Sequence, residues 1–276
     1  MLFRDYLVLI RGGGDLATGV TYRLHKAGFP VMVFELPRPL VVRRRVALAT
    51  AVIEKEITVE GMRGLLVESI EEGVDLARQG EIPVLIKPKM ASGNDKKHHQ
   101  FFKILVDARM AKRNIDTHRD QAPFVIALGP GFTAGVDCHV VIETMRGHYL
   151  GRVLWEGKAS PDSGTPGLIE GKGSERVIRS PADGIVRWNY DIGQWVREGT
   201  VIGSIGSKVM EASFDGLIRG LISPGTPVRS GLKIGDIDPR DDVAACFTIS
   251  DKALSIGGGV LEAILSWLNR QQASVV

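Results

Sequence analysis

The sequence predicts a chain of two folded parts: a Rossmann-like α/β domain with a parallel sheet, and a small all-β barrel-sandwich hybrid of the biotinyl/lipoyl type. Two observations carry this prediction. Near the N-terminus a strand, a glycine-rich turn, a helix and a second strand follow one another, and residues 183–205 repeat as residues 215–237. A C-terminal helix is expected to return to the first part. The 276 residues suffice for two domains.

The N-terminal pattern is that of a dinucleotide fingerprint. An apolar strand at residues 6–10 leads into Gly12, Gly13, Gly14 and Asp15, and a helix over residues 18–27 precedes a strand over residues 31–34 that ends in Glu35. Glycines let a backbone approach a pyrophosphate, the helix N-terminus faces its charge, and the acid meets a ribose hydroxyl. The carboxylate of Asp15 would repel a pyrophosphate unless a cation intervenes.

The segment after the second strand carries positive charge. Residues 41–47 hold Arg43, Arg44 and Arg45 and are expected to be helical, so that at least one arginine points to the carboxyl edge of the sheet. A surface helix with snorkelling arginines is the alternative.

A second basic segment lies further along the chain. From Lys87 to Asp120 there are nine Lys and Arg against four Asp, which indicates either a solvated loop or a site for a phosphorylated ligand.

Further elements complete the predicted α/β domain. We expect a helix at residues 71–79 and strands at residues 82–86, 104–107, 124–128 and 140–143. The loop with Gly129, Gly131 and Gly135 is a second candidate cradle for an anion, and Arg109, Lys112 and Arg113 lie on the loop between the two glycine-rich loops. In doubly wound folds ligands bind at this edge of the sheet.

The repeat has a β pattern. Ten of 23 aligned pairs are identical at an offset of 32 positions, and each copy reads as an Asp-Gly turn, a strand, a glycine turn and a second strand. The two copies should close on each other, because neither can bury its apolar face alone. In biotinyl and lipoyl carriers the modified lysine joins the halves, but Lys208 lacks the flanking signature and is expected to be an unmodified turn lysine.

These elements give the domain limits. We predict an α/β domain over residues 1–155, a Gly/Pro-rich linker over 156–175, the β domain over 176–240 and a C-terminal segment over 241–276 that packs on the α/β domain. Within that last segment a helix is expected over residues 260–268.

Composition excludes several classes of protein. The net charge of +3 does not indicate nucleic-acid binding, and no stretch approaches the roughly twenty apolar residues of a membrane span, so a cytoplasmic protein is expected. Cys138 and Cys246 show no metal-ligand spacing. The carboxylates of residues 236–242 could bind a divalent metal, but a polar turn is the preferred interpretation, and no metal site is assigned.

Eight strings spread over nearly the whole chain are specific enough to indicate a family: RGGGDLATGV, LPRPLVVRRRVA, VDARMAKRN, ALGPGFTAGVD, VIETMRGHYLGRV, GDIDPR, TISDKAL and GGGVLEAIL. They resemble the YqeB-type family, the accessory proteins of selenium-dependent molybdenum hydroxylases. The resemblance implies a bacterial or archaeal cytosolic protein that serves hydroxylase maturation, with the apo-hydroxylase as partner. In fold and pathway the chain is also similar to the XdhC-type chaperones, which hold molybdenum cofactor.

The leading functional hypothesis is therefore an accessory protein that binds an anionic cofactor, either a molybdopterin-type cofactor or a dinucleotide. The residues expected to hold it are Gly12, Gly13, Gly14, Asp15, Glu35, Arg43, Arg44, Arg109, Gly129, Gly131 and Gly135, with further charge from Arg11, Arg45, Lys112 and Arg113. The alternatives are an NAD(P)-dependent oxidoreductase, a selenium or sulfur transferase that uses a cysteine, and a non-catalytic docking scaffold. No catalytic residue is assigned, and a homo-oligomer is left open.

Overall fold

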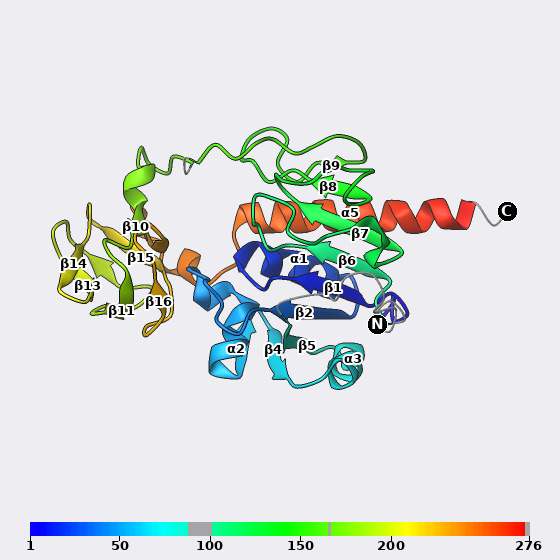
Figure 1. Ribbon diagram of the computed structural model, residues 1–276, viewed down its shortest axis with the longest axis horizontal. Coiled ribbons are helices and arrows are strands. Elements are labelled where there is room, and N and C mark those ends of the chain that lie inside the picture. The colour runs from blue at the N-terminus through cyan, green and yellow to red at the C-terminus, as the bar shows by residue number, and fades with distance from the viewer. Residues whose placement is uncertain (88–100, 165–166, 274–276) are drawn as a thin grey trace. The chain divides into compact units, whose positions relative to one another are not determined.

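The computed structural model describes residues 1–87, 101–164 and 167–273 (Figure 1). Part of the basic stretch (88–100) and two residues of the predicted linker (165–166) therefore lie outside the described residues. The chain forms two compact units. Unit 1 comprises Met1–Pro37, Leu48–Asp162 and Ile249–Val276, and unit 2 comprises Arg38–Ala47 and Ser163–Thr248.

Unit 1 is built on a nine-stranded mixed sheet in the order β3-β4-β5-β2-β1-β6-β7-β8-β9. Its strands are β1 (Val8–Arg11), β2 (Val31–Glu35), β3 (Glu56–Val59), β4 (Met62–Val67), β5 (Ile82–Ile86), β6 (Ile104–Asp107), β7 (Phe124–Leu128), β8 (Val140–Ile142) and β9 (Val153–Leu154). In this order, each strand from β4 through β5, β2, β1, β6 and β7 to β8 runs parallel to its neighbour. The strands β3 and β9 pair antiparallel at the two ends of the sheet. The central strands β1, β2, β6 and β7 are buried along their whole length, as expected where both faces of a sheet are covered.

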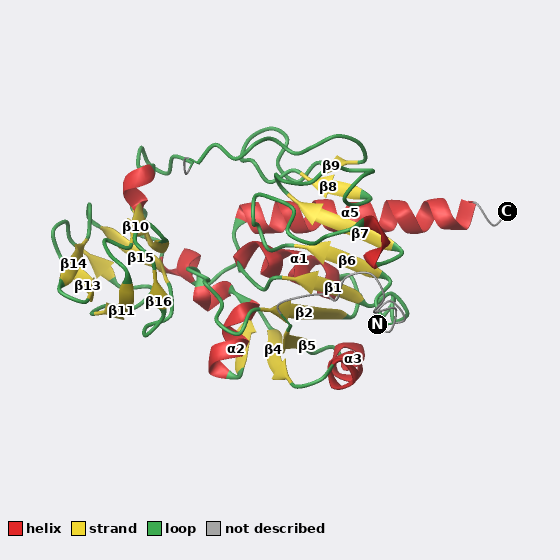
Figure 2. Cartoon of the chain, in the orientation of Figure 1, coloured by secondary structure: helices red, strands yellow, loops and turns green. Residues whose placement is uncertain are grey.

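Within the described residues of unit 1, the helices are α1 (Asp15–Lys26), α2 (Ala51–Glu54), α3 (Ile70–Gln79) and α5 (Asp251–Ala273), drawn in Figure 2. Side chains of α3 share a buried apolar cluster with Leu9, Met32 and Val125 of the sheet. Helix α5, orange to red in Figure 1, packs on α1 and contacts β8 and β9. None of the described helices combines the length and apolar character needed to cross a membrane.

Unit 2 consists of two four-stranded antiparallel sheets, in the orders β10-β17-β15-β12 and β14-β13-β11-β16. The strands are β10 (Val177–Arg179), β11 (Gly184–Trp188), β12 (Trp195–Val196), β13 (Val201–Ile205), β14 (Lys208–Glu211), β15 (Gly216–Leu221), β16 (Pro227–Val228) and β17 (Lys233–Asp238). At the offset of 32 positions β11, β12 and β13 correspond to β15, β16 and β17. Each copy also donates a strand to the other, because β12 pairs with β15 and β11 pairs with β16.

The structure corrects the predicted fold class, which is wrong. The large sheet is mixed rather than parallel, and the repeat forms two separate antiparallel sheets instead of a biotinyl/lipoyl barrel-sandwich. The physical reason lies in the edges. The strands β3 and β9 are only partly buried, so they lack the continuous apolar pattern by which the central strands were predicted.

At the level of elements the outcome is uneven. The strands over residues 82–86, 104–107 and 124–128 are confirmed. The helix predicted over residues 41–47 is wrong: only Arg44–Val46 forms a 3₁₀ turn, and Arg43 makes a parallel bridge to Leu221. Lys208 begins β14 and is exposed, directly after the two-residue turn that follows Ile205.

Candidate functional site

Five neighbouring parallel strands of unit 1 end at one edge of the sheet, here called the carboxyl edge. Their last residues are Arg11 (β1), Glu35 (β2), Asp107 (β6), Leu128 (β7) and Ile142 (β8). The loops over residues 12–14 and 129–135 therefore leave the same edge. Since β6 alone separates β1 from β7, the two loops lie two strands apart. Ligands of parallel sheets bind where such loops gather.

In the first loop, both the N–H and the carbonyl of Gly13 are hydrogen-bonded to other parts of the chain. Gly13 N–H donates to Glu35 Oε2 at 2.6 Å, and the Gly13 carbonyl accepts from Ala49 N–H at 2.9 Å. A Cβ at Gly13 would lie 2.7 Å from the Ala49 nitrogen, so a glycine is needed there for close packing of the backbone. Gly14 is half-buried at the N-cap of α1, with φ −66° and ψ 179°, a conformation open to any residue.

Glu35 faces the backbone. Its side chain accepts from the N–H groups of Gly13 (2.6 Å) and Leu36 (2.7 Å), one on each oxygen, and the residue is only 9 % exposed. Burial raises the pKa of this carboxyl above its ordinary value, against the opposing effect of those two hydrogen bonds. Each oxygen therefore already accepts one backbone N–H, and the carboxyl group stabilises the first glycine loop.

Beside Gly12 lies an arginine–aspartate cluster, defined as Arg11, Asp107, Arg109, Asp116 and Thr117. Asp107 is 1 % exposed and accepts from Arg109 Nε (3.0 Å), Arg109 Nη2 (2.6 Å) and the Thr117 hydroxyl (2.6 Å). Arg11 donates to Thr117 Oγ1 at 3.0 Å. Asp116 Oδ1 receives Arg11 Nη2 at 2.6 Å and Arg109 Nη1 at 2.7 Å. Two full positive charges are held at the carboxyl edge and matched by two carboxylates.

The second glycine loop is folded on itself. Gly129 N–H donates to the Ile142 carbonyl and Gly135 N–H to the Cys138 carbonyl. A Cβ at Gly131 would lie 2.5 Å from the backbone of Arg113, so this glycine is needed where the loop meets residues 112–113. The Asp137 carboxylate accepts the Thr133 N–H at 2.7 Å.

Two charged residues at this edge were missed. The Glu143 carboxylate accepts N–H groups of Thr144, Met145 and Ser160, each at 2.7 Å; burial opposes ionisation, but these bonds lower its pKa. Lys252 is half-buried in the first turn of α5, and burial lowers its pKa. The sequence signal for the true start of α5, and so for Lys252, was Ser250. Its side chain accepts the Ala253 N–H at 3.2 Å, as a helix cap does, and it lies ten residues before the predicted helix start.

Arg43 and Arg44 lie in unit 2 and bind other residues of that unit. Arg43 donates to the carbonyls of Ala245 (2.8 Å) and Thr248 (3.0 Å). Arg44 and Arg45 both pair with Asp191. These arginines thus have local partners in unit 2.

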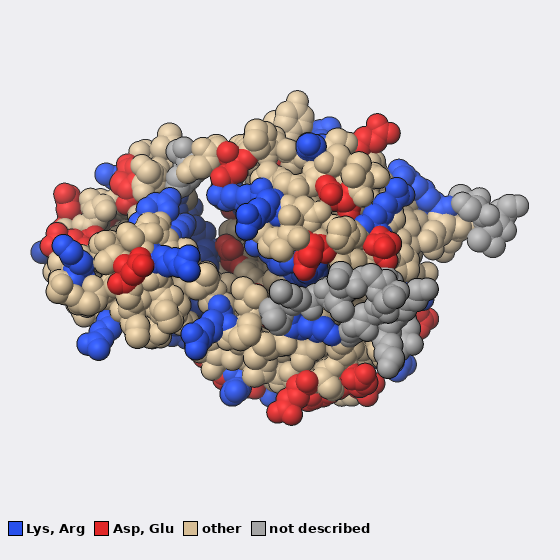
Figure 3. All heavy atoms as spheres, viewed as in Figure 1, with Lys and Arg blue, Asp and Glu red and all other residues tan. Residues whose placement is uncertain are grey.

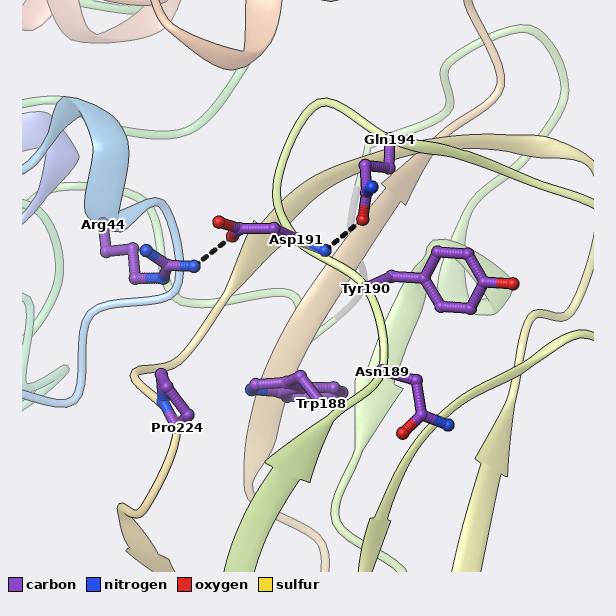
Figure 4. Close-up of a pocket in the computed structure, with 7 residues that line it drawn as sticks. All are labelled: Arg44, Trp188, Asn189, Tyr190, Asp191, Gln194 and Pro224. Atoms are coloured by element: carbon purple, nitrogen blue, oxygen red, sulfur yellow. Dashed lines mark hydrogen bonds and ion pairs between the residues drawn. The ribbon is translucent and has the colours of Figure 1, made fainter.

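The Arg44–Asp191 pair borders a cavity of about 310 Å³ in unit 2 (Figure 4). The Trp188 indole N–H is already bonded to the Ile222 carbonyl at 2.9 Å, and Gln194 accepts the Asp191 N–H at 2.6 Å. The cavity is lined by Arg44, Trp188, Asn189, Tyr190, Asp191, Gln194 and Pro224. On the face drawn in Figure 3, basic and acidic side chains are interspersed.

Both cysteines are buried and neither forms a disulfide. Cys138 is 0 % exposed, and burial, with the charges of Asp137 and Asp107, raises the pKa of its thiol to about 12. Cys246 is 1 % exposed, and burial likewise raises its pKa. A thiol is nucleophilic as the thiolate, so neither side chain is suited to group transfer in this state.

Comparison with known proteins gives one clear relative, and no family model matches the chain. The chain is 48 % identical over 264 residues to a protein of Escherichia coli (strain K12) described as "Uncharacterized protein YqeB". The aligned part is 96 % of this chain but 48 % of that protein, so the chain spans about half the length of its relative. The similarity supports the YqeB-type resemblance of the sequence and adds no statement of activity.

Two solved structures show weak likeness. An aspartoacylase family protein from Mesorhizobium loti is 12 % identical, with 86 % of each chain covered and a TM-score of 0.28. A succinylglutamate desuccinylase/aspartoacylase from Rhodobacter sphaeroides is 15 % identical, with 86 % of this chain and 87 % of that chain covered and a TM-score of 0.26. These scores are too low to support any statement about the present chain.

Proposed function

We propose that this chain is an accessory protein that binds an anionic cofactor at the carboxyl edge of unit 1, in the maturation of selenium-dependent molybdenum hydroxylases. The observation that supports the binding role best is the placement of Arg11 and Arg109 beside the loop of Gly12–Gly14, at the edge from which the Gly129–Gly135 loop also leaves. The pathway rests on the YqeB-type resemblance, with the apo-hydroxylase as the proposed partner.

The electrostatics favour a phosphate or pterin pyrophosphate as the group that is bound. A dianion near a partly desolvated edge requires full positive charge within hydrogen-bonding reach, and an arginine offers a planar pair of donors to it. Arg109 is 18 % exposed in its side chain and so can meet a ligand, and the 12-residue helix α1 starts beside the first loop with its partial positive charge.

The alternatives receive less support from the same residues. A transferase that works through Cys138 or Cys246 would need a thiolate, and burial holds both thiols protonated. An NAD(P)-dependent oxidoreductase would use Glu35 on the ribose, but both oxygens of Glu35 accept backbone N–H groups. The cofactor is therefore proposed to be anchored by its phosphate.

Gly14→Asp tests the site. Its backbone conformation is one that any residue adopts, and the substitution adds a side chain and a negative charge at the loop and at the start of α1. We expect binding of a phosphorylated pterin or nucleotide to weaken at least about tenfold, roughly 1.4 kcal/mol. Native mass spectrometry of the purified protein identifies a co-purifying cofactor, and titration calorimetry with that cofactor measures the change.

Gly14→Ala is the matched control, because it adds a Cβ without charge and should bind within about threefold of the wild type, roughly 0.7 kcal/mol. The proposed function would change to a docking scaffold if the wild type and Gly14→Asp bound the cofactor equally well. The same holds if no bound pterin or nucleotide is found.

A further inference from the structure

Asp116 is held by two arginines through a single oxygen. Its Oδ1 lies 2.6 Å from Arg11 Nη2 and 2.7 Å from Arg109 Nη1. The remaining bonds of those arginines hold them in place without it: Arg109 makes two bonds to Asp107, and both arginines donate to Thr117 Oγ1. The two donors would therefore stay convergent on one point if Asp116 moved away.

The four charged groups differ in exposure. The side chains of Asp107 and Arg11 are 2 % and 4 % exposed, whereas those of Arg109 and Asp116 are 18 % and 29 % exposed. Asp107 is thus the permanent counter-charge below the arginines, and Asp116 covers them on the side nearer to solvent. With Asp116 in place the four groups sum to zero, and without it they leave one positive charge.

We infer that Asp116 occupies the position of a ligand phosphate and acts as an internal competitor for it. Resting on the proposed function, this inference assigns the anion subsite to Arg11 Nη2 and Arg109 Nη1 and makes Asp116 the residue that sets affinity. A phosphate oxygen that displaces the carboxylate recovers the same two charge-assisted bonds, so binding exchanges one anion for another. The protein without cofactor then avoids a buried unpaired positive charge.

Asp116→Asn tests this with inorganic pyrophosphate as the probe and titration calorimetry at low ionic strength. The amide keeps the shape of the side chain and removes its charge, so we expect pyrophosphate to bind at least about tenfold more tightly than to the wild type. Asp120→Asn is the matched control. It removes one carboxylate from an exposed position four residues away, and its affinity should equal that of the wild type.

Arg109→Gln combined with Asp116→Asn should abolish the gain, because one of the two donors is lost. Should Asp116→Asn fail to fold, the wild type carries the test by carboxyl ¹³C NMR. The Asp116 signal must shift when pyrophosphate saturates the protein, while the signal of the buried Asp107 stays. An unchanged Asp116 signal would show that the pair is only a structural salt bridge.

The outcomes separate this inference from the proposed function. Unchanged affinity in Asp116→Asn, with a cofactor still weakened by Gly14→Asp, overturns the role of Asp116 alone. Tighter pyrophosphate binding without any pterin or nucleotide ligand supports the anion subsite and overturns the proposed cofactor. An equal gain in Asp120→Asn would reduce the effect to net charge and overturn the subsite.

Discussion

Glu35 shows how one residue type serves two purposes that a sequence pattern cannot distinguish. An acid at the end of the second strand indicates a ribose contact, but here its oxygens accept from Gly13 and Leu36 and it closes the glycine loop. The position was predictable from the strand and the spacing. The partner was not, because Ala49, which packs on Gly13, comes from a segment with no recognisable motif.

The buried carboxyl of Glu35 gives a pH dependence. Its native pKa is raised by burial above the ordinary value of 4.5, so the native state binds the proton more tightly than the unfolded state. This contribution to stability is present in full below the unfolded pKa and is lost as pH rises through the native pKa. Glu35→Gln cannot titrate, so its stability relative to the wild type should be greater at pH 7 than at pH 4.

Urea denaturation at the two pH values measures this difference, with Glu54→Gln as the control that removes an exposed carboxylate. A difference between Glu35→Gln and the wild type that does not change with pH, or that moves in the opposite direction, would show that Glu35 is not stabilised as the buried acid.

At the scale of elements, the packing of α5 explains why the helix was predicted to begin at residue 260 when it begins at Asp251. Three glycines at positions 257–259 lower helix propensity and suggest a break, yet the helix runs through them from Asp251. The reason is close packing. A Cβ at Gly257 would lie 2.5 Å from the Gly19 carbonyl of α1, and one at Gly259 would lie 2.0 Å from the Gly151 carbonyl. Only the tertiary contact shows that these glycines permit the helix to pack there.

The neighbouring glycines of α5 provide a matched pair. Gly259→Ala should lower the free energy of unfolding by about 1–3 kcal/mol, since the backbone at Gly151 must move to admit a methyl group. Gly258→Ala meets nothing within 4 Å and should raise it by up to about 1 kcal/mol through helix propensity. Denaturant titration of both variants decides. Equal effects of the two substitutions would mean that α5 is not tightly packed at Gly259.

For the whole molecule, the apolar pattern and the repeat predicted several strands but not the fold class. The buried strands over residues 82–86, 104–107 and 124–128 were found because each is a continuous apolar run. The predicted fold class was wrong because a local sequence pattern does not encode the direction in which strands pair or the exchange of strands. The outer strands β3 and β9 run antiparallel to their neighbours, and unit 2 divides into two sheets. The carboxyl edge followed from the strand ends, whereas the counter-charges of Arg11 and Arg109 depend on side-chain geometry.

The exchange of strands between the two copies implies that unit 2 unfolds as one cooperative body. Ile202 and Ile234 are the same position of the repeat and are both 0 % exposed in one buried cluster. Each truncation to Ala should cost about 2–5 kcal/mol. Because β12 pairs with β15 and β11 with β16, neither copy can open without breaking pairs of the other. In hydrogen exchange, amides of β11 and β15 should therefore lose protection together in both variants, and a loss confined to the substituted copy would contradict this.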